Sequence, residues 1–168
     1  MPSSSPYRNT KFVNIRHATL ADFPQIQTLE VQSSTAAHWT KAQYDALFAA
    51  HAPLRIALLA RFDTDDQVGG FLIASCLTDD WEIENIVVNE NRKRRGIGTA
   101  LVGQLVAEAQ AAGARSVTLE VRESNAPARQ LYESVGFTYE ARRKLYYRDP
   151  DEDAILYRRS LQFCDKIS

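Results

Sequence analysis

The sequence predicts a mixed α/β fold in which a mostly antiparallel sheet of six to seven strands is flanked by about four helices. Three observations lead to this expectation. Short segments of alternating apolar and polar residues recur along the chain, as expected of strands. Four other segments carry the start or stop signals of helices. Three of the strands follow one another without an intervening helix, which favours a mixed sheet with helices on its faces.

Helix and strand signals place the elements of the first half of the chain. Thr19, with Asp22 three residues later, forms a loose capping-box pattern at a helix start. Thr40 is the expected N-cap of a second helix, which ends before Pro53 because proline disfavours a helical residue in front of it. Turn-like residues at 63–66 separate two apolar runs, which predicts a β-hairpin. The predicted elements are a strand at 12–17, helices at 19–31 and from 40 to before 53, and strands at 55–61, 68–77 and 81–88.

The second half contains the clearest helix of the chain. Apolar residues recur every four positions over Ile97–Ala109, and Gly113 is the expected residue just past the helix end. Asn125 is the expected cap of a further helix, with Pro127 in its first turn and Gly136 at its end. We expect the strands on either side of the longer helix to pair in parallel with a right-handed crossover. The predicted elements are a helix at 97–112, a strand at 116–122, a helix from 125 to 136, and strands at 137–147 and 152–161.

Length and composition indicate one globular domain. The chain has 168 residues, of which 45% are hydrophobic and 24% charged, values typical of a soluble protein with a single domain. The first residues are rich in serine and proline and carry no apolar signal core. We therefore expect a disordered leader at 1–10, a single domain at 11–162 and a short tail at 163–168.

The same composition excludes several classes of partner. A formal net charge of −1 gives no electrostatic basis for direct nucleic-acid binding, and no apolar stretch approaches the ~20 residues that cross a membrane. Cys76 and Cys164, together with His17, His38 and His51, form no metal-ligand or triad spacing, so no metal is expected. No disulfide scaffold is indicated, which favours a reducing, cytoplasmic compartment. The sequence leaves the oligomeric state open.

The segment Arg92–Thr99, here called the cationic loop, joins a predicted strand to the start of the long helix. Gly96 and Gly98 let the backbone approach a ligand closely, and the first N–H groups of the helix have no partners within it. Together with the helix dipole and the run Arg92–Arg95 they suit an anion. A dinucleotide fingerprint would need a third glycine where Leu101 stands, and the ending of a P-loop is absent, so a pyrophosphate bound outside both motifs remains. A basic helix start with glycines for turn geometry alone is the alternative.

Several motifs, in order along the chain, resemble the GNAT acetyltransferases. Lys93-x-x-Gly96-x-Gly98 is similar to the coenzyme A pyrophosphate loop of that family, Gln/Arg-x-x-Gly-x-Gly/Ala, with Lys93 in the first position. The strand at 83–88 resembles the family's central strand. Four further segments resemble the RimI branch of the family, which acetylates the N-terminal alanine of a ribosomal protein: residues 38–40, 119–126, 131–137 and 146–154. The whole resemblance covers roughly residues 13–161.

The resemblance implies the GNAT fold and acetyl-CoA as co-substrate. It implies that coenzyme A contacts the backbone of the central strand, the cationic loop and Asn125, which is also the expected helix cap. The cofactor-binding residues so implied are Ile86, Val87, Val88, Lys93, Arg94, Arg95, Gly96, Ile97, Gly98, Thr99 and Asn125.

Acetyl transfer to an amine requires a proton acceptor, and an α-amino group with a pKa of about 8 needs only a modest base. The resemblance implies Glu120 as this base, acting directly or through water, and Tyr132 as the general acid toward the departing thiolate. The alternatives are a solvent-facing glutamate on a strand and a tyrosine that packs in the core. Glu82 and Glu84 are weaker candidates for the base.

The resemblance further implies an acceptor. Tyr146, Tyr147, Glu152 and Asp153 either line an acceptor groove or form cross-strand pairs that stabilise a hairpin. The implied reaction is acetylation of a protein N-terminal α-amine, the alanine of a small-subunit ribosomal protein. Two alternatives stay open: a GNAT enzyme for a small amine, with the helices at 19–50 setting the choice, and a non-catalytic module that binds acyl-CoA.

Overall fold

The computed structural model describes residues 13–34, 36–47, 49, 54–62, 67–77 and 79–161. The expected leader at 1–10 and tail at 163–168 lie outside the described residues, as do His51 and Cys164. Over the described ranges the order of helices and strands is the predicted one. The elements are β1 (Val13–His17), α1 (Phe23–Val31), α2 (Lys41–Leu47), β2 (Leu54–Phe62), β3 (Val68–Leu77), β4 (Asp80–Val88), α3 (Ile97–Ala111), β5 (Ser116–Arg122), α4 (Ala126–Ser134), β6 (Thr138–Tyr147) and β7 (Glu152–Ser160), with 3-10 turns η1 (Leu20–Asp22) and η2 (Glu90–Arg92).

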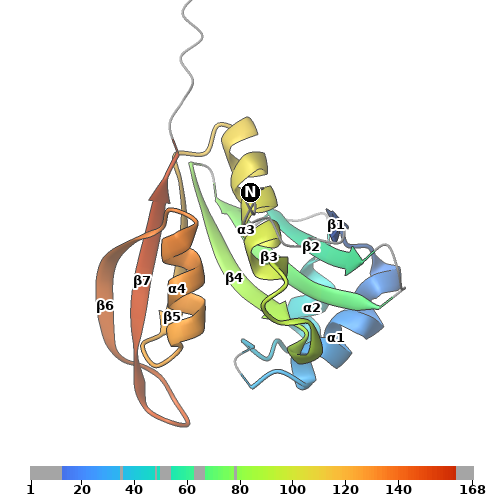
Figure 1. The fold of residues 1–168 in the computed structure, drawn as a ribbon, viewed down its shortest axis with the longest axis horizontal. Coiled ribbons are helices and arrows are strands. Elements are labelled where there is room, and N and C mark those ends of the chain that lie inside the picture. Colours follow the sequence, from blue (N-terminus) through green and yellow to red (C-terminus); the bar gives the residue numbers. More distant parts are fainter. Residues whose placement is uncertain are drawn as a thin grey trace, which may run out of the picture.

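The strands form one mixed sheet in the order β1-β2-β3-β4-β5-β7-β6 (Figure 1). Neighbouring strands are antiparallel except β4 and β5, which pair in parallel and are joined by α3. The mostly antiparallel sheet and the parallel crossover around α3 therefore confirm the predicted fold class.

Helices cover both faces of the sheet, because the apolar residues of its central strands alternate between two cores. On one face α3 and α4 pack against Leu58, Leu72 and the β5 residues Val117 and Leu119. On the other face α1 and α2 pack against a separate set of side chains that includes Phe71. Each face of β2 and β3 is buried, which explains why these strands are nearly continuous apolar runs.

Local signals in the sequence explain where several elements begin and end. The Asp22 carboxylate accepts a hydrogen bond from the Thr19 N–H at 2.8 Å, as the capping-box pattern predicted. Gly113 and Gly136 have φ angles of 81° and 87°, so both helices end in the left-handed conformation that glycine favours. One difference is that a separate 3-10 turn precedes α1, which begins at Phe23 instead of continuing from Thr19.

Within the described ranges, no helix is long and apolar enough to span a membrane. Cys76 is half-buried, because it lies near the end of β3, where the apolar run stops.

Candidate active site

The two central parallel strands separate part-way along their length. β4 and β5 pair only from Asp80–Ile83 to Ser116–Leu119. At the same level the pairing of β3 with β4 shifts register, because Ala74 faces Ile83 whereas Ile73 faces Asn85, leaving Glu84 as an extra residue. Beyond Ile83, β4 therefore has no described strand beside it on its β5 side, and its backbone groups there are available to a ligand.

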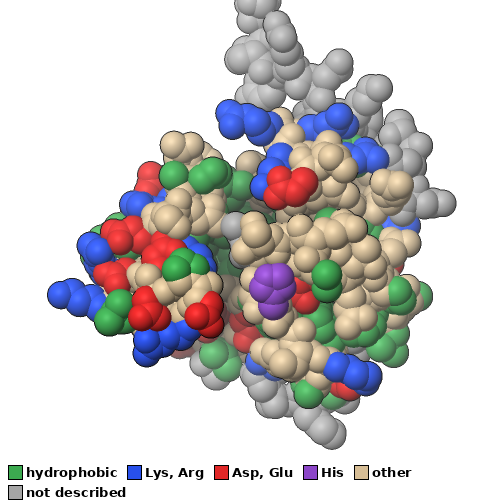
Figure 2. Space-filling view, turned by 90° about the horizontal axis from the view of Figure 1, so that it is seen from below, with side chains coloured by type: hydrophobic (Ala, Val, Ile, Leu, Met, Phe, Trp, Pro, Cys, Tyr) green, Lys and Arg blue, Asp and Glu red, His purple; other side chains and the backbone are tan. Residues whose placement is uncertain are grey.

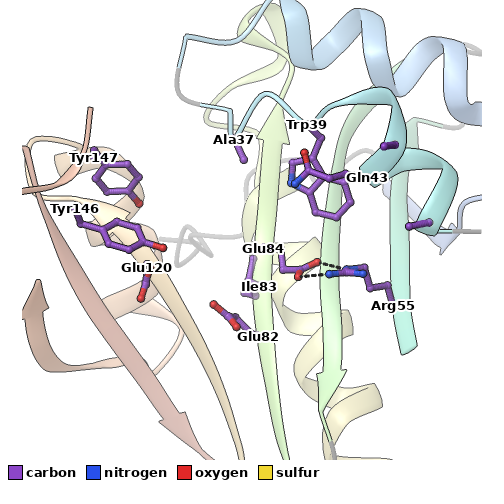
Figure 3. Close-up of a pocket in the computed structure, with 12 residues that line it drawn as sticks. Ala37, Trp39, Gln43, Arg55, Glu82, Ile83, Glu84, Glu120, Tyr146 and Tyr147 are labelled. Carbon is purple, nitrogen blue, oxygen red and sulfur yellow. Dashed lines mark hydrogen bonds and ion pairs between the residues drawn. The ribbon is translucent and has the colours of Figure 1, made fainter. Parts of the chain in front are cut away.

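A pocket of about 490 Å³ lies at this separation, and we call it the β4–β5 pocket. Figure 2 shows the molecule hollowed between the half that carries α4, β6 and β7 and the half that carries α1–α3. Three carboxylates point into the pocket from the two strands, and aromatic side chains face them from either side (Figure 3). The lining residues are Ala37, Trp39, Ala42, Gln43, Ala46, Arg55, Glu82, Ile83, Glu84, Glu120, Tyr146 and Tyr147.

Two of the three carboxylates are held by arginines. Arg55 donates to both oxygens of Glu84, at 2.7 and 3.0 Å, and its guanidinium lies 5.8 Å from the centre of the Trp39 ring. Arg143 of β6 forms an ion pair with Glu120 at 2.7 Å, and the Glu120 side chain is only 12% exposed. The bidentate geometry on Glu84 fixes its orientation, so this carboxylate forms a fixed part of the pocket wall.

Glu82 lies between these two pairs and has no ion-pair partner among the residues that the structure describes. Burial, followed by the nearby charges of Glu120 and Glu84, raises the pKa of the Glu82 carboxyl, and Arg143 opposes this shift. Three acidic groups in one pocket, of which two have guanidinium partners, form an environment that favours a positively charged group.

Two tyrosines form the opposite wall. Burial raises the pKa of Tyr147 to about 12, with Glu120 adding to the shift, and the Arg122 guanidinium lies 4.4 Å from its ring centre. The Tyr146 hydroxyl interacts with the Glu120 carboxylate, which is the largest cause that raises the Tyr146 pKa. Both hydroxyls therefore stay protonated near neutral pH and act as hydrogen-bond donors beside Glu120.

Tyr132, the second expected catalytic residue, lies behind this wall and does not line the pocket. It is on α4, 4% exposed, with ring-centre distances of 5.9 Å to Phe137 and 6.4 Å to Tyr157. Burial raises the pKa of Tyr132, and the charge of Tyr147 raises it further. The pocket lining therefore includes Glu120 and Tyr147 but not Tyr132.

The cationic loop begins α3 on the opposite face of the sheet from the pocket carboxylates. Gly96 has a φ of 79°, and Ala100 donates the first backbone bond within the helix, to the Gly96 carbonyl at 2.9 Å. The N–H groups of Ile97, Gly98 and Thr99 precede that bond, so they have no acceptor within the helix. The side chains of Lys93, Arg94 and Arg95 are exposed, as a site for a charged group in solution requires.

Contacts of the loop explain its shape. Arg92 and Arg95 lie over the Phe62 ring, with distances of 4.9 and 5.9 Å to its centre. Lys93 forms an ion pair with Glu90 at 2.5 Å. Gly98 faces α4, because a Cβ there would come within 2.6 Å of a methyl group of Leu131. This second glycine is therefore needed for helix packing, whereas Gly96 supplies the turn.

The other residues expected to hold a cofactor lie between the loop and the pocket. Ile86 and Val88 are half-buried and pack on the α3–α4 face, whereas Val87 is buried under α1 and α2. The Asn125 side chain accepts from the Ala128 N–H at 3.3 Å, which confirms its role as a helix cap. The unpaired edge of β4 runs from the pocket toward the cationic loop, so the residues present fit an extended ligand whose anionic end is at the loop.

The hairpin residues proposed for an acceptor groove divide into two groups. Tyr146 and Tyr147 line the pocket. Glu152 instead accepts from the Ser124 N–H and from Arg122, and Asp153 from the Leu145 N–H and Arg142, so both stabilise the hairpin. Three pocket residues with large polar or aromatic side chains were not singled out from the sequence as site residues, because each becomes part of a site only through contacts with distant strands: Trp39, Gln43 and Arg55.

No group of three or more His, Cys, Asp or Glu side chains in the described ranges has the arrangement of a metal site. The three histidines had been expected to form no ligand set. His17 is exposed and lies 3.0 Å from Glu108, and His38 is exposed.

Comparison with known proteins identifies the family. The family model for the acetyltransferase (GNAT) family matches residues 16–137. This chain belongs to the GNAT acetyltransferase family. Its resemblance to that family, inferred above from motifs, is thereby confirmed. The fold is confirmed by a crystal structure of the ribosomal-protein-S18-alanine N-acetyltransferase from Escherichia coli, which has a TM-score of 0.79 to this chain at 26% identity. That comparison covers 94% of this chain and 99% of the crystallised chain.

Relatives with assigned names point to one branch of GNAT proteins. The [ribosomal protein bS18]-alanine N-acetyltransferase of Salmonella typhimurium is 38% identical over 98 residues, which are 57% of this chain and 66% of the relative. The protein from Escherichia coli K12 with the same name is 39% identical over 92 residues, 54% of this chain and 62% of the relative. The matched part therefore spans just under two thirds of these relatives. A putative enzyme of that name from Bacillus subtilis is 30% identical over 142 residues, 84% of this chain and 91% of the relative.

Proposed function

We propose that this GNAT protein transfers the acetyl group of acetyl-CoA to the N-terminal α-amine of a protein, with the N-terminal alanine of a small-subunit ribosomal protein as acceptor. The observation that carries the proposal is the β4–β5 pocket, in which Glu82, Glu84 and Glu120 meet at the point where the two strands separate. An acidic, open pocket suits a cationic chain terminus. The names of the relatives, which specify ribosomal protein bS18 and alanine, support the acceptor, and such an acceptor places the activity in the cytoplasm.

The cationic loop and the free edge of β4 would hold the co-substrate. The N–H groups of Ile97, Gly98 and Thr99 and the charges of Lys93, Arg94 and Arg95 would bind its pyrophosphate. The backbone of Ile86–Val88 would pair with its extended arm. When bound, acetyl-CoA supplies an acyl group activated as a thioester.

Glu120 is the proposed proton acceptor. Its carboxylate faces the pocket, and the ion pair with Arg143 and the contact with Tyr146 hold it in one position. An α-ammonium group with a pKa of about 8 must lose a proton before it can attack, and a carboxylate can take it directly or through a water molecule. Glu82, whose pKa is raised in part by the charge of Glu120, lines the same pocket and is a second candidate for this proton.

Tyr132 is the proposed proton donor on the other side of the reaction. Because burial raises its pKa, the hydroxyl keeps its proton throughout the physiological range. Its position behind Tyr147 lets it serve a thiolate that approaches from the α3–α4 face, the same face as the cationic loop.

The test is acetylation of a short peptide with a free N-terminal alanine and no lysine, followed by mass spectrometry. We expect the mass of one acetyl group on the α-amine, and no change in a control peptide of the same sequence whose N-terminus is already acetylated. A panel of polyamines, amino acids and aminoglycosides, measured by release of free thiol, tests the small-amine alternative. Turnover of a panel member without turnover of the peptide would overturn the proposal.

A further inference from the structure

Strand β6 carries a bulge next to the pocket. Arg143 pairs with Ala154 and Tyr147 pairs with Glu152, so the three residues 144–146 of β6 stand opposite the single residue Asp153 of β7. Leu145, in the middle of the bulge, has a φ of 51°, in the left-handed region that is unfavourable for a leucine. This conformation requires support from other parts of the molecule.

The Asp153 side chain supplies that support. One carboxylate oxygen accepts from the Leu145 N–H at 2.8 Å, and the other accepts from Nε of Arg142 at 2.6 Å. Arg142 also donates to Glu123 at 2.8 Å, which connects the bulge to the turn between β5 and α4. The Asp153 side chain is 15% exposed, and the Leu145 and Arg142 hydrogen bonds lower its pKa.

The bulge decides which side chains face the pocket. In a regular strand adjacent residues point to opposite faces, so Tyr146 and Tyr147 could not both line one pocket. They do so here because the bulge breaks the alternation of β6 between Arg143 and Tyr147. It also lets Arg143 and Tyr146, which are three positions apart, approach the same Glu120 carboxylate.

We propose that Asp153 is a positioning residue for the acetyl-transfer reaction: it holds the β6 bulge that brings Tyr146 and Arg143 against Glu120 and so shapes the acceptor side of the β4–β5 pocket. The inference rests on the proposed function. It assigns to Asp153 an effect on the acceptor and on Glu120, and none on the cationic loop, which lies on the other face of the sheet.

Two substitutions and a control test this role. Asp153→Ala removes both hydrogen bonds of the carboxylate, and we expect kcat/KM for the alanine peptide to fall about tenfold or more, chiefly through the peptide KM, as loss of a half-buried acceptor predicts. Asp153→Asn keeps an oxygen for the Leu145 N–H and should recover most of the activity. The KM for acetyl-CoA should stay within about twofold in both.

The control is Glu140→Ala in the same hairpin. Glu140 accepts from Arg158 at 2.7 Å, an ion pair between β6 and β7 like that of Asp153, but it lies at a separate shift of register between Tyr139 and Ala141, away from residues 144–146. We expect it to leave both KM values unchanged. Hydrogen exchange of the Leu145 amide, measured in all variants, should accelerate in Asp153→Ala alone.

The outcomes separate this proposal from the proposed function. A wild-type protein that does not acetylate the peptide overturns the proposed function, and the positioning role falls with it. An active wild type whose Asp153→Ala variant keeps its peptide KM, or loses affinity for both substrates equally, overturns the positioning role and leaves the function standing.

Discussion

The cationic loop and the β4–β5 pocket lie on opposite faces of one sheet and are formed by different parts of the chain, one by a contiguous segment and the other by distant elements. The loop is a contiguous segment whose exposed backbone N–H groups and arginines would hold a ligand. The pocket is made of side chains from β2, β4, β5, β6, α2 and the segment before α2, held by ion pairs between residues far apart in the chain, such as Arg55 with Glu84. Substitutions in the pocket should therefore change catalysis or acceptor affinity, whereas substitutions at the loop should change cofactor affinity.

Glu120→Gln should have the largest effect. The substitution preserves shape and removes the proposed proton acceptor, so kcat should fall about 10²- to 10⁴-fold. The dissociation constant of acetyl-CoA, measured by calorimetry, should not change, because the loop is untouched. Glu140→Gln, which makes the same change on an exposed part of β6, is the control and should retain full activity. A Glu120→Gln enzyme with normal kcat would remove this residue from the mechanism.

Asn85→Asp should destabilise the buried hydrogen bonds that hold the segment before α2, which lines the pocket. Asn85 is 4% exposed, donates to Glu30 at 2.8 Å and accepts from the Ala37 N–H at 3.3 Å; Glu30 in turn accepts from the Trp39 N–H at 2.9 Å. A second carboxylate here would lose the donor and repel Glu30, lowering the free energy of unfolding by about 3–5 kcal/mol at neutral pH.

The pH dependence gives Asn85→Asp a distinct signature. Repulsion would raise the pKa of the introduced carboxyl above its unfolded value, so the loss of stability should be greatest at neutral pH and shrink as pH falls through that raised pKa. Urea unfolding at several pH values measures this. The exposed Asn14→Asp is the control, with an expected change under about 0.5 kcal/mol. A loss that does not depend on pH would contradict the charge-repulsion account.

Gly70→Ala should disturb the cofactor side more than the pocket. A Cβ at this position would lie 2.8 Å from the Val87 carbonyl oxygen and 2.9 Å from a methyl group of Ile97, the first residue of α3. We expect a loss of about 1–3 kcal/mol in stability and a larger rise in the acetyl-CoA KM than in the peptide KM. Gly103→Ala, in α3 with no atom within 4 Å of the added Cβ, should instead stabilise by about 0.5–1 kcal/mol. Equal effects on both KM values would contradict the separation of the cofactor site at the cationic loop from the acceptor side in the β4–β5 pocket.

Glu82→Gln should have the smallest effect on stability, and with an opposite sign. The folded-state pKa of Glu82 is raised, so its ionised form costs stability at pH values above the ordinary glutamate pKa, and that cost is absent in acid. The substitution should raise Tm by about 1–2 °C at neutral pH, with the gain disappearing as pH falls below about 4.

The same substitution should change the pH profile of kcat/KM. In the wild type the fall of kcat/KM in acid should begin above the ordinary carboxyl range, and Glu82→Gln should move this fall to lower pH. A fall that begins at the same pH in both proteins would exclude Glu82 as the second candidate for the proton of the α-ammonium group.

Sequence patterns predicted the elements well because their signals are local. The stripe of α3, the Asn125 cap and the glycines at 113 and 136 all act within a few residues, and the structure has them as expected. The two irregularities that matter most were not predicted. The extra residue Glu84 in β4 and the bulge at 144–146 in β6 depend on pairing with another strand, which no local pattern encodes.

The candidate site could be predicted only in part, because some of its features depend on consecutive residues and others on contacts between distant strands. The cationic loop could be located from consecutive residues, whereas Glu120 and the two tyrosines of β6 were expected in separate roles and line one pocket in the structure. The burial of Tyr132 behind Tyr147 and the use of Asp153 as a support were not distinguished from their alternatives. A side chain in a strand can face a pocket or brace it, and only its partners decide which.

By itself the sequence determined the order of helices and strands and the family to which the chain belongs, and it located the start of α3 that is proposed to bind an anion. Those properties depend on periodicity, caps and glycines that act over a few residues. The tertiary structure alone decided where β4 and β5 separate, which carboxylates face one another and which arginines hold them. Such contacts join residues such as Arg55 and Glu84, or Glu120 and Arg143, that are brought together only when the sheet has formed with its registers fixed.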